Sequence, residues 1–397
     1  LKDVTGSGIG ATVTKKLTLD LNGHSIKRIK ETSDSNAVYP ALYVNGGNLT
    51  LIDTSAAKTG AVKSVITATT GASPYNAVSS AVYVNGGTFT LKSGALSTDV
   101  KNDKDQSQGV VVCQNSKFIM EDGSIIAESD SGNAFGVVAF TGSEFTLNNG
   151  TITSTGMGIS GNGSSGEGNT TININGGSVT GQSTGIYQPQ EGALNITAGE
   201  IKGCTGIEAK SGNVKIEITG TPTITATGEV KHTPSGNGNS TSGYAIAAVE
   251  NNAYSGNANV SIANGFYNGE VKILKDNDVD AGKTATITIT GGLFSSEPNS
   301  TYIAANHYVD GSNNSDYPYE VKVGPKTGAA IIVTDDTTPT IHSNANLSEA
   351  DENAISRVIS KTEVDGVTEA IGDNKATLVG SAANGADKVE VKVDVKV

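Results

Sequence analysis

A short phrase recurs along the chain with fixed internal spacing, and this repeat limits the possible folds more than any other feature. The copy at 144–152 reads EFTLNNGTI, in which an apolar residue is followed by a second one two positions later and by a glycine five positions later. Seven copies keep this spacing. Its three columns are Phe89, Phe118, Phe145, Ile172, Leu194, Val260 and Ile287, then Leu91, Met120, Leu147, Ile174, Ile196, Ile262 and Ile289, then Gly94, Gly123, Gly150, Gly177, Gly199, Gly265 and Gly292.

Alternation with a period of two places both apolar columns on one face of a β-strand. The glycine permits a sharp turn with positive φ, so each copy predicts a strand, a turn and a strand. A third short strand precedes several copies, as in ALYVN from 41, AVYVN from 81 and GVVVC from 109. A unit of three short strands cannot bury its apolar face alone, so successive units must stack. The sequence therefore predicts an all-β fold, a right-handed parallel β-helix that forms a three-sheet solenoid of about ten coils.

The ends of the repeat define the regions that we expect. The stretch KLTLDLNGHSI at 16–26 has the same alternation and predicts the first coil, and 285–296 predicts the last clear one. A solenoid exposes its core at both ends unless it is capped, and the aromatic, alternating segment 302–324 is the predicted cap. We expect a parallel β-helix with a terminal cap over 1–330 and a small α+β appendage over 331–397.

The appendage has a different pattern. Ser348 and Asp351 have the spacing of a capping box, and the residues that follow them predict a helix. The final KVEVKVDVKV alternates strictly and predicts a strand. Because the chain stops inside that strand, we expect the natural protein to extend beyond residue 397.

Charge and composition exclude several classes of function. The formal net charge is −13, and such a surface repels the phosphates of nucleic acids. No run of about 18 apolar residues occurs, so we expect no membrane insertion. Two cysteines in 397 residues do not form a disulfide framework. The interruptions between coils, such as 225–243, are polar and glycine-rich, and ligand specificity is expected there or on the sheet beside them.

The outward positions of the first strand of each coil are where a ligand groove is expected. That column reads Tyr43, Tyr83, Val111, Val138, Ser160, Tyr187, Glu208 and Ala247. Tyr43, Tyr83 and Tyr187 are candidate ligand-binding residues, because tyrosines can stack on sugar faces. The alternative is that aromatic residues merely suit β-strands. The column holds one carboxylate, whereas a glycoside hydrolase uses two, about 5 to 9.5 Å apart, so we name no catalytic residue.

One acidic stretch has the spacing of a calcium loop. KDNDVDAG at 275–282 offers Asp276, Asp278 and Asp280 at alternating positions. The glycine comes one position late, and Ile287 stands where a bidentate glutamate is needed. These aspartates are weak metal candidates beside the alternative of a solvated acidic turn, and we expect no cofactor.

The phrases LTLDLNGHSI, YVNGG, INGG and GGLFSSEP, with the ending YEVKVG, resemble those of large surface β-helix proteins of commensal gut bacteria. The chain resembles the pectin-lyase-like superfamily more loosely, over about residues 10–330. The first resemblance implies a cell-surface or secreted protein of the kind often described as an adhesin. The tripeptide RIK at 28–30 also occurs in polygalacturonase signatures, but the accompanying aspartate motifs and Gly-His-Gly are missing.

Three functions remain open from the sequence. The first is a non-enzymatic extracellular or cell-surface module that binds a glycan or a host or cell-surface protein. The second is a polysaccharide lyase or glycoside hydrolase of the pectin-lyase-like type, for which the acidic and basic groups are few. The third is a passive surface spacer. We expect the first, and therefore no enzymatic activity.

Overall fold

The structure is a computed structural model. It describes residues 2–8, 10–31, 36–67, 77–113, 115–162, 169–189, 191–235, 238–254, 256–276, 279–280 and 282–323, together with four strands between 330 and 394. The chain divides into two compact units, residues 1–287 and 288–397. Each unit is described by itself.

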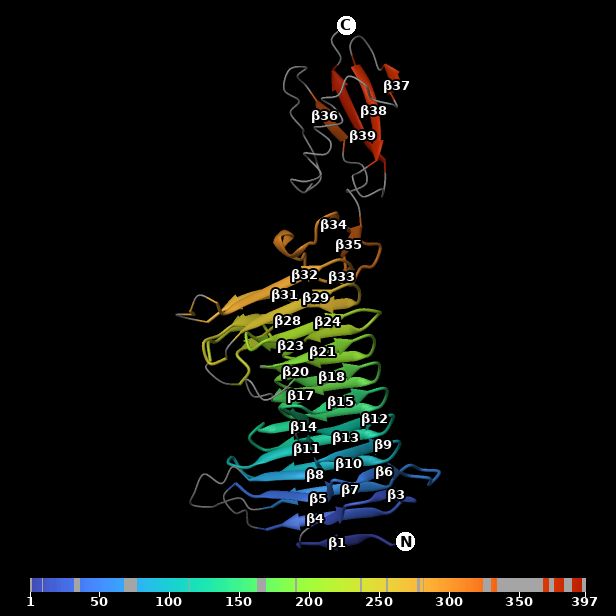
Figure 1. The fold of residues 1–397 in the computed structure, drawn as a ribbon, viewed down its shortest axis with the longest axis vertical. Helices are drawn as coiled ribbons and strands as arrows, with labels where there is room; N and C mark the ends of the chain where they lie inside the picture. Colours follow the sequence, from blue (N-terminus) through green and yellow to red (C-terminus); the bar gives the residue numbers. More distant parts are fainter. Residues whose placement is uncertain are drawn as a thin grey trace. The chain divides into compact units, whose positions relative to one another are not determined.

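Three parallel sheets wind around a common core in the first unit, and most strands pair with the third strand after them (Figure 1). Sheet I contains β1 (Val4–Gly6), β4 (Ser25–Lys30), β7 (Ala61–Ile66), β10 (Ala95–Val100), β13 (Ser124–Ser129), β16 (Thr151–Ser154), β19 (Ser178–Gly181), β22 (Glu200–Gly203), β25 (Thr223–Ala226) and β30 (Phe266–Asn268). Sheet II contains β2 (Ala11–Val13), β5 (Val38–Asn45), β8 (Val78–Asn85), β11 (Gln106–Val112), β14 (Ala134–Phe140), β17 (Met157–Asn162), β20 (Thr184–Gln188), β23 (Thr205–Lys210), β28 (Tyr244–Glu250) and β31 (Glu270–Lys275).

Sheet III completes each coil. It contains β3 (Lys16–Asp20), β6 (Asn48–Ile52), β9 (Gly87–Leu91), β12 (Ser116–Met120), β15 (Glu144–Leu147), β18 (Thr170–Ile174), β21 (Gly192–Ile196), β24 (Val214–Ile218), β29 (Asn257–Ile262) and β32 (Thr284–Ile289). β23, β24 and β25 pair instead with β28, β29 and β30, because β26 (Lys231–His232) and β27 (Thr241–Ser242) lie between them in the chain. Sheets II and III thus hold ten strands each among the described residues. The predicted architecture, a parallel β-helix of about ten coils, is confirmed.

The second unit contains two small groups of strands. β33 (Gly292–Phe294), β35 (Tyr319–Val323) and β34 (His307–Gly311) pair antiparallel in that order, and a 3-10 turn covers Ser300–Tyr302. β36 (Ala330–Val333), β39 (Lys388–Asp394), β38 (Lys375–Ser381) and β37 (Val367–Ala370) form a four-stranded sheet in that order. The helix predicted after Ser348 lies outside the described residues. The boundary predicted at residue 330 stays a prediction.

The apolar columns read from the sequence form the core. Phe89, Phe118, Phe145, Ile172 and Leu194 are register partners on successive strands of sheet III, and all are fully buried. The phenyl rings stack, with centroids 5.0 Å apart for Phe89 and Phe118 and 4.9 Å apart for Phe118 and Phe145. Each coil therefore buries its apolar face against the coils on both sides of it.

The predicted turn glycines have the backbone conformation that the repeat requires. At all seven positions φ is positive, between 73° and 115°. L-residues with a Cβ rarely adopt these angles. This explains why the third column of the repeat tolerates no other residue in those seven copies.

A second glycine column lies within successive strands of sheet II. Gly109, Gly136, Gly158, Gly185 and Gly206 occupy it. At Gly158 an added Cβ would lie 2.6 Å from the carbonyl oxygen of Gly185 and 2.6 Å from a methyl carbon of Val179. Close packing of neighbouring coils at this position therefore excludes a side chain.

A buried aspartate holds together the turns of the first two coils. The side-chain oxygens of Asp53 accept hydrogen bonds from the backbone amides of Gly23 (2.8 Å), Ser55 (3.1 Å) and Gly60 (2.6 Å). Burial by itself raises the pKa of Asp53, but hydrogen bonds from Ser55, Gly60 and Gly23 outweigh it and lower the pKa to about 2. The ionised carboxylate thus stabilises this end of the solenoid.

The first coil begins earlier than the sequence predicted. β1 and β2 precede the predicted start at residue 16 and pair with β4 and β5. These strands have three residues each, too short to show the alternation used for prediction. No helix in the described part of the chain is long and apolar enough to cross a membrane.

Candidate functional site

The outward column of sheet II has the register that the sequence predicted. Tyr43 pairs with Tyr83, and the column continues through Val111, Val138, Ser160, Tyr187 and Glu208 to Ala247. Its side chains differ in size along the solenoid. The small residues Val111, Val138 and Ser160 lie between Tyr83 and Tyr187, and the outer face is hollowed over Val138 and Ser160.

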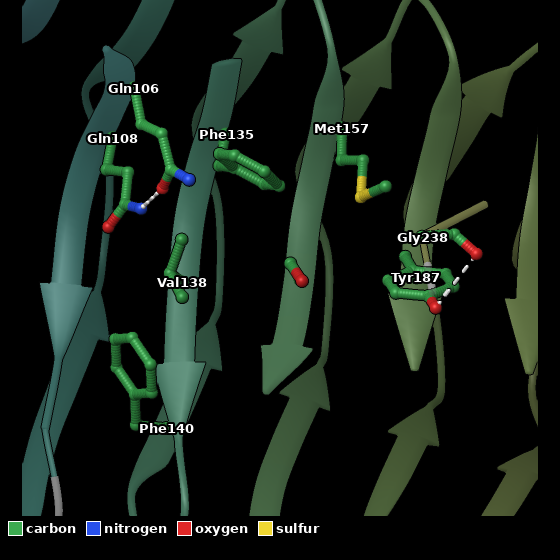
Figure 2. Close-up of a pocket in the computed structure, with 9 residues that line it drawn as sticks. Gln106, Gln108, Phe135, Val138, Phe140, Met157, Tyr187 and Gly238 are labelled. Atoms are coloured by element: carbon green, nitrogen blue, oxygen red, sulfur yellow. Dashed lines mark hydrogen bonds between the residues drawn. The ribbon is translucent and has the colours of Figure 1, made fainter. Parts of the chain in front are cut away.

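A cavity of about 330 Å³ occupies this hollow, over β11, β14, β17 and β20 (Figure 2). Val138 and Ser160 form its floor and are 3% and 6% exposed. Phe135 and Met157, which are register partners on neighbouring strands, line one end. Phe140, five residues further along β14, lines the other.

Two glutamines of β11 form one side of the cavity. The Nε2 of Gln108 donates a hydrogen bond of 2.6 Å to the Oε1 of Gln106 (Figure 2). Gln108 is buried and Gln106 is half-buried. The pair therefore presents neutral donor and acceptor groups to the cavity.

Tyr187 and Gly238 form the opposite side. The Tyr187 hydroxyl donates to the carbonyl oxygen of Gly238 at 3.0 Å, and its oxygen lies 3.0 Å from the hydroxyl of Tyr254. Burial raises the pKa of Tyr187 well above its ordinary value. The phenol therefore stays protonated and acts as a hydrogen-bond donor.

The long insertion at 225–243 brings Gly238 to the sheet. Its short antiparallel hairpin, β26 (Lys231–His232) and β27 (Thr241–Ser242), folds back onto sheet II. Glu208 anchors it, because its carboxylate accepts from the backbone amides of Ser240 (2.8 Å) and Thr241 (3.1 Å) and from both hydroxyls. Lys210 Nζ lies 3.0 Å from the same carboxylate, and both charged side chains are fully buried.

This arrangement assigns a structural role to the one carboxylate of the outward column. The lone pairs of Glu208 are used by the hairpin and by Lys210. A general acid or base must instead reach the substrate within hydrogen-bond distance. The described residues that line the cavity include no carboxylate, imidazole or amine.

The three candidate tyrosines have different environments. Tyr187 lines the cavity but is only 4% exposed, because residues of the insertion cover it. Tyr43 and Tyr83 lie outside the cavity, half-buried, with ring centroids 5.7 Å apart in an edge-to-face pair. The structure thus brings one of the three to the site.

Of the candidate calcium residues, the structure describes Asp276 and Asp280, whose side chains have different environments. Asp276 Oδ1 lies 2.7 Å from His232 Nε2, and Asp276 Oδ2 accepts from Asn251 Nδ2. Asp280 is exposed, and Asp278 lies outside the described residues. Within the described part of the chain, no group of three or more histidine, cysteine, aspartate or glutamate residues could hold a metal ion.

Of the RIK tripeptide, Arg28 is buried, whereas Ile29 and Lys30 are half-buried. Arg28 is 8% exposed, donates to the carbonyl oxygen of Pro40 at 2.9 Å and lies 5.1 Å from the centre of the Tyr39 ring. Burial lowers the pKa of the Arg28 guanidinium. This environment indicates packing between sheets I and II.

Sequence reasoning missed Phe135, Phe140, Met157 and the two glutamines. A signal was present, because in AFGVVAF at 134–140 one phenylalanine stands on each side of four small residues. The fold of the insertion over sheet II had no such signal.

Comparisons with protein-family models, with curated proteins and with solved structures return no match to this chain.

Proposed function

We propose that the protein is a non-enzymatic binding module that acts outside the cell, at the cell surface or after secretion, and that the cavity over β11–β20 is its ligand site. The ligand is a glycan or a protein. The single observation that supports this function best is the composition of the cavity, which combines aromatic and aliphatic walls with neutral polar groups and, among its described residues, has no carboxylate, imidazole or amine.

The position of the cavity also supports a binding role. Its floor and three of its sides come from strands of one sheet, which hold side chains more rigidly than loops do. Pockets of this kind, mostly apolar with a few placed polar groups, are the usual form of small-ligand sites. A passive spacer would need no such hollow.

The test uses a variant that fills the cavity. Ser160→Tyr introduces the residue that already stands in the same column at positions 83 and 187, so the sheet can carry it. Wild type and variant are applied to a printed array of neutral and acidic glycans, purified mucin and extracellular-matrix proteins. Tyr43→Ala is the matched control, because Tyr43 lies in the same column outside the cavity.

We expect at least one spot that retains the wild type and Tyr43→Ala but loses Ser160→Tyr. Retention of all three proteins by the same spots, or of none by any spot, would contradict the proposed site. Antibody labelling of intact producing cells tests the location, and signal only after lysis would contradict it.

A further inference from the structure

We infer that the cavity binds one neutral pyranose ring, a single sugar residue without carboxylate, sulfate or amine groups. This inference rests on the proposed function and specifies its ligand. It follows from the size of the cavity, from the groups that lack partners in it and from its lack of charge.

Size limits the ligand to a single ring. Sites for small molecules measure about 300–1,000 Å³, and the volume of about 330 Å³ lies at the lower limit. The floor between Phe135 and Phe140 consists of Val138 and Ser160, which leaves space for one flat group. A longer chain could continue only out of the open side.

The free polar groups match a ring that carries hydroxyls. Among the described residues, the amide nitrogen of Gln106, the Oε1 of Gln108 and the hydroxyl of Ser160 have no protein partner, and all three residues line the cavity. Together they offer donors and acceptors on two sides. The hydroxyls of a sugar both donate and accept, so one ring can satisfy all three groups.

The apolar walls match the C–H faces of the same ring. Phe135 and Phe140 are half-buried, so part of each ring is open to a ligand, and Met157 lies beside Phe135 (Figure 2). Aromatic faces bind flat apolar surfaces well. An apolar side chain of a protein partner would contact these walls equally, but it would leave three polar groups without water or partner, which is unfavourable.

Charge selects a neutral sugar. The described lining residues carry no cation to neutralise a uronate or a sulfate. Burying an unpaired charge is costly, and the net charge of −13 repels anions over the whole surface.

The experiment compares matched pairs of methyl glycosides by ligand-observed NMR and calorimetry. Methyl glucoside is paired with methyl glucuronide, and methyl galactoside with methyl galacturonide, so that each pair differs only at the carbon that bears the acid. Methyl mannoside and methyl N-acetylglucosaminide extend the neutral set. The proteins are wild type, Ser160→Tyr, Gln106→Ala and the control Tyr43→Ala, each checked for an unchanged circular dichroism spectrum.

We expect at least one neutral glycoside to bind wild type at least tenfold more tightly than its acid. The same binding should be lost in Ser160→Tyr, weakened about five- to tenfold in Gln106→Ala and unchanged in Tyr43→Ala.

Three outcomes overturn the inference. They are an acid that binds as tightly as its neutral pair, sugar binding that persists in Ser160→Tyr, and no binding of any glycoside. If an acid binds as tightly as its neutral pair, or if no glycoside binds, array binding that is lost in Ser160→Tyr would still support the proposed function. Failure of this inference and failure of the proposed function are therefore distinguishable.

Discussion

Replacing Phe118 with alanine should destabilise the solenoid more than the same change at Phe145. Both side chains are fully buried in the same column of sheet III. Phe118 has a stacked ring on each side, at 5.0 Å and 4.9 Å, whereas Phe145 has a ring on one side and Ile172 on the other. The two sites therefore differ by one aromatic pair.

The magnitudes follow from that geometry. A phenylalanine-to-alanine change in a core costs about 3–5 kcal/mol of unfolding free energy, and an aromatic pair contributes about 0.5–1.5 kcal/mol beyond its buried area. We expect about 4 kcal/mol for Phe145→Ala and about 5 kcal/mol for Phe118→Ala. Phe118→Leu should cost only about 1–2 kcal/mol, because leucine fills this column at 49 and 194.

Equilibrium unfolding in urea measures these differences. Far-ultraviolet circular dichroism reports the sheets, and the fluorescence of the 12 tyrosines is a second probe, since the chain has no tryptophan. Coincident curves are required before free energies are compared, because solenoids can unfold in parts. A loss below about 1 kcal/mol for both alanine variants, or a clearly larger loss at Phe145, would refute the stacked-core argument.

Three further predictions concern stability and activity. The pKa of Asp53 is lowered to about 2 from an ordinary 3.8, so its ionised carboxylate contributes stability above about pH 4 that is lost as the pH falls toward 2. Asp53→Asn should therefore cost about 2 kcal/mol at pH 7 and flatten the pH dependence of urea unfolding between about pH 4 and 2. An unaltered pH profile would contradict this. Glu208→Ala removes the ionic partner of buried Lys210, so it should cost about 3–5 kcal/mol of unfolding free energy in urea and speed proteolysis of the 225–243 hairpin. Adding Lys210→Met should recover part of that unfolding free energy. No recovery would argue against the ion pair. Polygalacturonate, with or without calcium, should yield neither unsaturated products nor new reducing ends, and turnover that disappears when one acidic residue is mutated would favour the enzyme alternative.

The repeat was predictable because one physical rule governs every coil. Alternation with a period of two identifies the inward residues, such as Phe118 and Ile174, and the turn glycine sets the register. The same rule placed Tyr43, Tyr83 and Tyr187 in one outward column, as the structure has them.

The site was harder to predict because it depends on what covers the outer face. Tyr187 lies in the expected column, but the insertion hides it through Gly238. The anchor of that insertion, Glu208, contacts Ser240 and Thr241, more than 30 residues away in sequence. No periodic pattern indicates a contact between an irregular loop and a strand.

The outward column of sheet II also determines how the width of the cavity can change during evolution. Each coil supplies one residue to the column, and neighbouring coils are about 4.8 Å apart. Val138 and Ser160 occupy two successive positions of the column and form the floor of the cavity beside Tyr187. Gain or loss of a coil with a small residue would therefore widen or narrow the cavity in whole steps of one strand spacing, without any change in the core behind it.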